Sequence, residues 1–88
     1  MSSYFEPKIP APEEILHSDG DPYIIFGISN KATCREIKSQ YKELSIKYNA
    51  ARGIYNKTKE EIEKITKIQM MVNQANEELK KNHNCEQI

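Results

Sequence analysis

The sequence predicts an all-α fold, in which an antiparallel two-helix hairpin follows an extended, Pro-rich N-terminal arm and a short preceding helix. Two Thr-x-x-Glu capping boxes each precede a run of apolar residues spaced by three and four. No segment shows the alternation of apolar and polar residues that is typical of a strand. The 88 residues allow one small domain, so the two apolar stripes must face each other to form its core.

Residues 1–20 are expected to form the arm. Pro7, Pro10 and Pro12 fix backbone torsions and remove hydrogen-bond donors, which favours an extended chain with at most one helical turn at residues 13–17. A loosely packed tail and an arm that docks on a partner both fit this pattern.

The short helix is predicted within the run DPYIIFGIS. Asp21 can cap its N-terminus, Pro22 suits a first helical turn, and Gly27 can end the helix. About two turns of apolar helix should result, and they begin the predicted helical domain, residues 21–81.

The first long helix is predicted to begin at the capping box of Thr33 and Glu36. Its apolar stripe consists of Ile37, Tyr41, Leu44 and Tyr48. Its other face carries basic residues mixed with Glu36 and Glu43, and these basic residues are Arg35, Lys38, Lys42 and Lys47.

The second long helix is predicted to begin at the capping box of Thr58 and Glu61. Its stripe consists of Ile62, Ile65, Ile68 or Gln69, Val72, Ala75 and Leu79. Lys80 and Lys81 suit a helix C-terminus, and residues 82–88 are expected to form a frayed tail.

Composition argues against several classes of function. Thirteen basic and thirteen acidic residues cancel, so no overall field favours a nucleic acid as partner. No stretch of 18 apolar residues that could span a membrane is present. Cys34 and Cys85 allow a disulfide without implying one, and they lack the spacing of a metal site. No nucleophile and base, phosphate loop or cofactor motif is evident, so we expect neither an enzyme nor a cofactor.

The run DPYIIFGISNKATCREIKSQYKELSIKY, residues 21–48, resembles the first half of a J domain, the DnaJ-type co-chaperone module. The family pattern D-x-Y-x-x-L-G-[VI]-x-x-x-A-[TS]-x-x-E-I-K-x-x-Y-R-x-L-[AS]-x-x-Y aligns with it without a gap. The matching residues are Asp21, Tyr23, Gly27, Ile28, Ala32, Thr33, Glu36, Ile37, Lys38, Tyr41, Leu44, Ser45, Lys47 and Tyr48. Residues 58–79 fit the third helix of the family more weakly.

Within the family, the chain is most similar to the J domain of the Sec-family membrane subunit of the ER translocon. This likeness rests on DPY before the first helix, GIS after it, IKSQYKELSIKY in the second, and Arg52-Gly53-Ile54 in the loop. It implies a membrane translocon complex as partner and a place in the ER lumen. A J-like protein of another kind would be cytoplasmic.

J domains carry His-Pro-Asp after the second-helix tyrosine, where this chain has Asn49, Ala50 and Ala51. The resemblance implies that this tripeptide triggers ATP hydrolysis by a DnaK-family chaperone. Asn49 does not titrate near neutral pH, and Ala51 offers no carboxylate. Because no proline stops the helix, we expect it to run one turn further and to end at Gly53 as a left-handed cap.

The resemblance assigns chaperone binding to Lys38, Tyr41, Lys42 and Lys47, with Glu43 reversing one local charge. A solvated face paired with neighbouring glutamates is the alternative. The expected function is that of a co-chaperone module of protein translocation or folding that does not stimulate the chaperone's ATPase. A silent regulatory partner of another J protein and a structural accessory subunit of a larger complex remain as alternatives.

Overall fold

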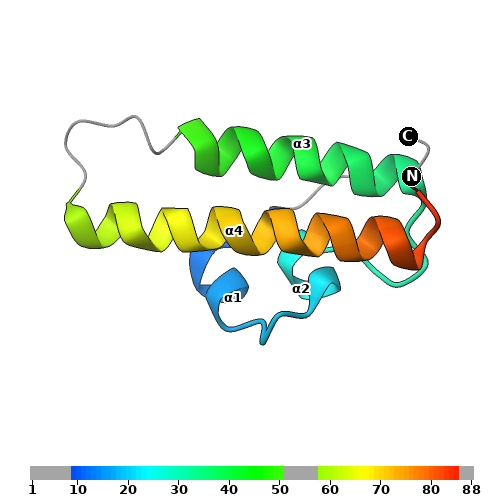
Figure 1. Ribbon diagram of the computed structural model, residues 1–88, viewed down its shortest axis with the longest axis horizontal. Coiled ribbons are helices and arrows are strands. Elements are labelled where there is room, and N and C mark those ends of the chain that lie inside the picture. Colours follow the sequence, from blue (N-terminus) through cyan, green and yellow to red (C-terminus); the bar gives the residue numbers. More distant parts are fainter. Residues whose placement is uncertain (1–8, 51–57, 86–88) are drawn as a thin grey trace, which may run out of the picture.

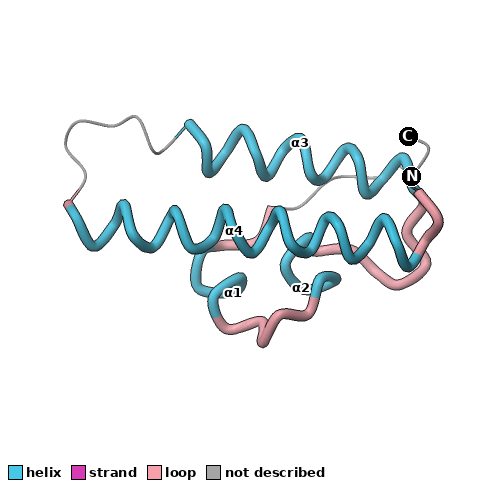
Figure 2. The backbone as a smooth tube through the Cα atoms, viewed as in Figure 1, coloured by secondary structure: helices cyan, strands magenta, loops and turns pink. Residues whose placement is uncertain are grey.

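Four helices form the part of the chain that the computed structural model describes, residues 9–50 and 58–85, with the backbone alone at 49 and 50. In chain order they are α1 (Pro12–Leu16), α2 (Pro22–Phe26), α3 (Cys34–Ala50) and α4 (Lys59–Asn82). The two long helices lie side by side and run in opposite directions, and α1 and α2 lie against α4 (Figure 1). These ranges contain no strand, so the predicted all-α class is confirmed for them (Figure 2).

Helices α2, α3 and α4 begin at the capping residues that the sequence predicts, and α2 also ends at its predicted cap. Before α3, the Thr33 N–H donates to Glu36 Oε1 at 2.8 Å, and the Glu36 N–H donates to Thr33 Oγ1 at 3.2 Å. Before α2, Asp21 Oδ1 accepts the Tyr23 N–H at 2.9 Å. Gly27 ends α2 with a left-handed φ of 67°, a conformation that glycine adopts without steric cost.

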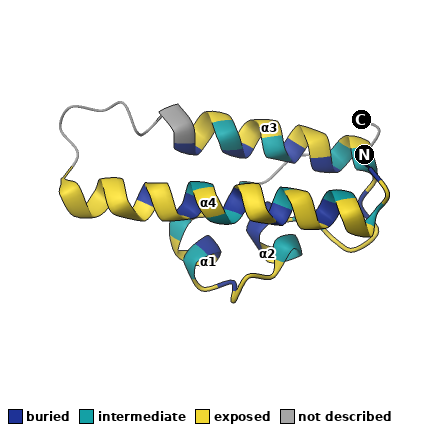
Figure 3. Cartoon of the chain, viewed as in Figure 1, coloured by how far each residue is buried: buried dark blue, intermediate teal, exposed yellow. Residues whose placement is uncertain are grey.

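Helix α4 begins with the second predicted capping box, in which Thr58 and Glu61 exchange hydrogen bonds of 2.9 and 3.2 Å. Most of its predicted stripe is buried, and the buried members are Ile65, Ile68, Val72, Ala75 and Leu79. Of the two residues predicted as alternatives in this stripe, Ile68 and Gln69, it is Ile68 that is buried in the core. Ile62 was also predicted to pack, yet it is 40% exposed, and the first turns of α4 are exposed in Figure 3.

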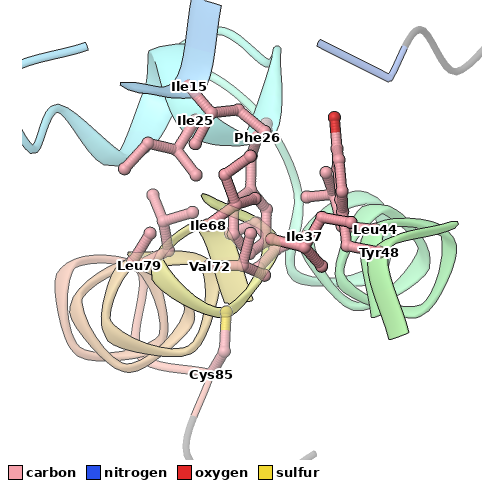
Figure 4. Close-up of a cluster of buried hydrophobic side chains, with 13 residues drawn as sticks. Ile15, Ile25, Phe26, Ile37, Leu44, Tyr48, Ile68, Val72, Leu79 and Cys85 are labelled. Atoms are coloured by element: carbon pink, nitrogen blue, oxygen red, sulfur yellow. The ribbon is translucent and has the colours of Figure 1, made fainter. Parts of the chain in front are cut away.

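A single apolar core lies among the four helices, and Figure 4 shows side chains from all of them converging on it. Its most completely enclosed apolar side chains are Ile15, Ile25, Phe26, Ile37, Leu44, Ile68 and Leu79. Tyr41, predicted for the stripe of α3, is only partly buried at the edge of this core.

The segment before residue 21 contributes to the core where it is described. We expected an extended chain with one turn at residues 13–17, and the structure has helix α1 at Pro12–Leu16 with Ile15 completely buried. Pro12 fits the first helical position, and the Ala11 N–H donates to Glu14 Oε1 at 2.8 Å. Glu13 pairs with Lys64 of α4 at 3.0 Å, and this ammonium group lowers the pKa of the exposed Glu13 carboxyl.

Tyr48 joins the end of α3 to this N-terminal segment. Its hydroxyl donates a buried hydrogen bond to the carbonyl oxygen of Pro10 at 2.7 Å. Burial raises the pKa of the Tyr48 phenol, and the carboxylate of Glu14 raises it further. Because the folded chain then holds this proton more tightly than the unfolded chain, the resulting stabilisation is present below about pH 10 and is lost as the pH rises further.

Replacing Tyr48 by phenylalanine is expected to lower the free energy of unfolding by about 1–2 kcal/mol, because the Pro10 carbonyl would lose its donor in a buried place. The matched control is Tyr41→Phe. The Tyr41 hydroxyl donates to Asn73 Oδ1 at 2.8 Å in an exposed position, so its loss should cost about 0.5 kcal/mol or less. Urea unfolding measures both, and equal losses would contradict the role assigned to Tyr48.

One polar side chain, Gln40 of α3, is completely buried in the core. Its Nε2 donates to the carbonyl oxygen of Phe26 at 2.7 Å. Phe26 is the last residue of α2, where carbonyl groups have no partner within their own helix. The sequence pattern does not mark Gln40 as buried, since a glutamine on a helix is exposed in most proteins.

The chain after α4 turns back towards the beginning of α3. We expected a frayed tail from residue 82, but Cys85 is only 3% exposed and forms a disulfide with Cys34, with their Cα atoms 5.6 Å apart. Nε2 of His83 lies 2.9 Å from the Tyr23 hydroxyl. The described part of the tail is therefore attached to both α2 and α3.

Candidate functional site

The outer face of α3 carries a shallow groove, which we call the α3 basic face. The lining residues are Arg35, Lys38, Ser39, Tyr41, Lys42, Ser45 and Ile46. Its surface is mostly apolar, and Ile46 is 55% exposed. Long basic side chains can cover apolar surface with their stems while their charged ends stay in water. The face thus combines positive charge with exposed apolar area.

The positive charge of this face comes from one arginine and two lysines. Arg35, Lys38 and Lys42 form no ion pair with any residue that the structure describes. Glu43 was expected to reverse one charge here, but it does not line the groove. A site of this kind suits an acidic protein surface, because complementary potentials steer encounter and select partners.

The structure divides the four residues that the resemblance assigns to chaperone binding. Lys38, Tyr41 and Lys42 line the α3 basic face together. Lys47 does not, because it follows Lys42 by five residues, which is about 140° around a helix. Its ammonium group lies 5.6 Å from the centre of the Tyr48 ring instead. The helical period alone could have separated Lys47 from the other lysines.

Tyr41 makes contacts within the fold as well as lining the α3 basic face. Its ring lies nearly parallel to that of Phe26, with an interplanar angle of 12° and centroids 6.4 Å apart. Its hydroxyl bonds to Asn73 and so links α3 to α4. A partner on the α3 basic face could contact the edge of this ring, while the ring's position is set by the core.

Two of the three residues that the resemblance aligns with His-Pro-Asp lie at the end of α3. Asn49 and Ala50 are its last two residues, so the helix continues beyond Tyr48. Ala51 and the predicted cap at Gly53 lie outside the described residues.

A second groove lies between the beginning of α3 and the end of α4, beside the disulfide. It has a volume of about 190 Å³. The residues lining it are Cys34, Ile37, Lys38, Tyr41, Asn76, Lys80 and Cys85. The spacing of the two cysteines does not by itself imply their pairing, although an antiparallel hairpin brings the start of its first helix close to the end of its second. That geometry was the available signal for this site.

Across residues 9–50 and 58–85, no group of three or more His, Cys, Asp or Glu side chains is placed to hold a metal ion. No helix in the same ranges combines the length and the apolar character needed to cross a bilayer. No protein-family model, curated protein or solved structure matches the chain.

Proposed function

We propose that the chain is a J-domain-like co-chaperone module that binds a DnaK-family chaperone without stimulating its ATPase. The observation that carries this proposal is the α3 basic face, on which Arg35, Lys38 and Lys42 surround exposed apolar surface without an ion pair among the described residues. This face lies in the segment with the gapless J-domain pattern. Protein translocation or folding is the proposed setting.

The loss of His-Pro-Asp supports binding without activation. Asn49, Ala50 and Ala51 provide neither a titrating imidazole nor a carboxylate at the end of the second family helix. The charges of the α3 basic face are independent of these three residues. Docking and stimulation are therefore separable in this chain, and a chaperone held without hydrolysis would remain in its ATP-bound state.

The disulfide favours the ER lumen among the proposed locations. Disulfides persist in oxidising compartments and are rare in the cytosol. This agrees with the proposed likeness to the translocon subunit, whose J domain faces the lumen.

Binding to a purified ER-luminal DnaK-family chaperone in ATP tests this proposal. We expect a complex, no rise in single-turnover ATP hydrolysis, and binding about tenfold weaker after Lys42→Glu, because this change reverses a charge on the α3 basic face. Lys47→Glu is the matched control on the same helix and should change affinity by no more than about twofold, since Lys47 lies outside the face. Equal effects of the two changes, or stimulated hydrolysis by the natural chain, would contradict the proposal.

The triple variant N49H/A50P/A51D separates loss of the trigger from loss of docking. We expect it to stimulate hydrolysis if the α3 basic face still positions the chain on the chaperone. A triple variant that binds without stimulation would mean that the docking geometry has also changed. Binding of another J protein instead of the chaperone would favour the regulatory alternative, and a stable complex of several subunits would favour the accessory one.

A further inference from the structure

The groove beside the disulfide places this bond near two cationic side chains. Cys34 and Cys85 form one part of its wall, and Ile37 and Tyr41 form an apolar part. A molecule in this groove would lie beside the two cysteines that form the bond. This arrangement goes beyond chaperone binding and does not depend on it.

The two cysteines differ in their surroundings. Cys34 is partly exposed and is the first residue of α3, a helix of 17 residues, whereas Cys85 is 3% exposed. The N-terminus of a helix favours a thiolate, and an apolar setting disfavours one. Cys34 is therefore the sulfur that an external thiol can reach and that can leave again as a thiolate.

The cations come from both long helices. Lys38 of α3 and Lys80 of α4 line the groove, so positive charge lies along both of its sides. Glu77 is 4.0 Å from the Lys80 ammonium, and its carboxylate side chain is 77% exposed, so this pair is weak. Carboxylates on an incoming thiol would be attracted to the two lysines while its thiol approaches the sulfurs.

We propose that this groove is a thiol–disulfide exchange site for an anionic thiol of low molecular weight, of the glutathione class. The thiolate of the first molecule attacks Sγ of Cys34, the Cys34–Cys85 bond breaks, and Cys85 leaves with the electron pair and takes up a proton. A second thiolate then attacks the glutathione sulfur of the mixed disulfide. Glutathione disulfide and a Cys34 thiolate result, so two thiols are oxidised as one protein disulfide is reduced.

Reduction at this site would release the tail and weaken the fold as a whole, because the link joins residues 51 apart in the sequence. The carbonyl oxygen of His83 lies 3.4 Å from Sγ of Cys34 and 3.5 Å from Sγ of Cys85, and the His83 ring contacts Tyr23 of α2. Once the covalent link is broken, residues 83–85 are held by these weaker contacts and by backbone hydrogen bonds to the end of α4, among them the one from the Cys85 N–H to the Lys80 carbonyl oxygen at 2.7 Å. The site thereby makes the attachment of the tail to α2 and α3 dependent on the thiol pool.

The test compares the reduction rates of the oxidised full chain by glutathione and by 2-mercaptoethanol, which is neutral. Samples are taken at intervals, their free thiols are alkylated, and the protein mass is measured by mass spectrometry. We expect K38E/K80E to slow reduction by glutathione about tenfold, because an attracting site becomes a repelling one, and to leave the rate with 2-mercaptoethanol within about twofold. Circular dichroism before reduction checks that the variant is folded.

K59E/K67E is the matched control, since it changes the net charge equally at exposed positions of α4 outside the groove. This control variant should slow the reduction of the disulfide by glutathione by less than about twofold at physiological salt. Equal slowing by the two double variants would overturn the proposal, because only net charge would then matter. An unchanged glutathione rate in K38E/K80E, or free thiols in the air-oxidised chain, would also overturn it. K80E alone separates this site from the α3 basic face, because Lys80 belongs only to the groove.

Discussion

Replacing Cys34 and Cys85 together by serine is expected to lower the free energy of unfolding by about 4 kcal/mol, the loss predicted for a cross-link that closes a loop of this length. The cysteines are 51 residues apart, so the disulfide restricts most of the unfolded chain. A core of this size provides only about 3–5 kcal/mol of net stability. The variant should therefore be partly unfolded at 37 °C, with a Tm lower by at least about 15 °C.

Thermal unfolding followed by circular dichroism measures this effect. The control is the natural chain reduced by a phosphine, which should match the double serine variant because both lack the same covalent link. A loss of less than about 1 kcal/mol would contradict the expectation, since it would mean that the link does not restrict the unfolded chain. A reduced natural chain that stays much more stable than the variant would assign the effect to the serine side chains instead.

Phe26→Ala is expected to lower the free energy of unfolding by about 3–5 kcal/mol, the cost of truncating a large aromatic side chain in a closed core. Phe26 is completely buried and stacks on Tyr41. Its side chain lies where α2, α3 and α4 meet (Figure 4). The cavity would therefore remove contacts that hold all three helices together.

Ile24→Ala is the matched control, because Ile24 lies in the same short helix and is 48% exposed. It should cost about 0.5 kcal/mol or less, as surface substitutions usually do. Urea unfolding of both variants at one temperature gives the comparison. If Phe26→Ala costs less than about 1 kcal/mol, α2 does not form part of the cooperative core.

The parts of the fold that the sequence predicts are those encoded by neighbouring residues. Thr33 and Thr58 mark the beginnings of α3 and α4 because a capping box spans only three residues. Gly27 ends α2 for an equally local reason. The helical period correctly gave most of the buried positions of α4, because one face of a helix must be apolar to pack.

The parts that could not be predicted depend on residues far apart in the sequence. Ile15 lies in a proline-rich segment whose local pattern favours extended chain, and its burial depends on the surface that α2 and α4 present to it. The pairing of Cys34 with Cys85 depends on how α3 and α4 align along each other. Such contacts become predictable only when the tertiary arrangement is known.

The candidate site was predicted in part. Lys38, Tyr41 and Lys42 were assigned to chaperone binding and lie together. Arg35, which was named only as part of the basic side of the helix, and Ile46, which was not named, line the same face. Family resemblance assigns roles one position at a time and so does not reveal the neighbours that complete a surface. The groove beside the disulfide could not be predicted without knowing that Cys34 pairs with Cys85.

The buried amide of Gln40 has a consequence for how uniquely the helices fit together. Apolar contacts alone would tolerate α2 at neighbouring positions along α3, since Ile25 and Phe26 are both apolar. The hydrogen bond from Gln40 to the Phe26 carbonyl forms in only one of these positions. A shift of one residue would break it in a dry interior, where a lost hydrogen bond is costly. One polar side chain in the core thus selects a single arrangement from several that would bury similar apolar area.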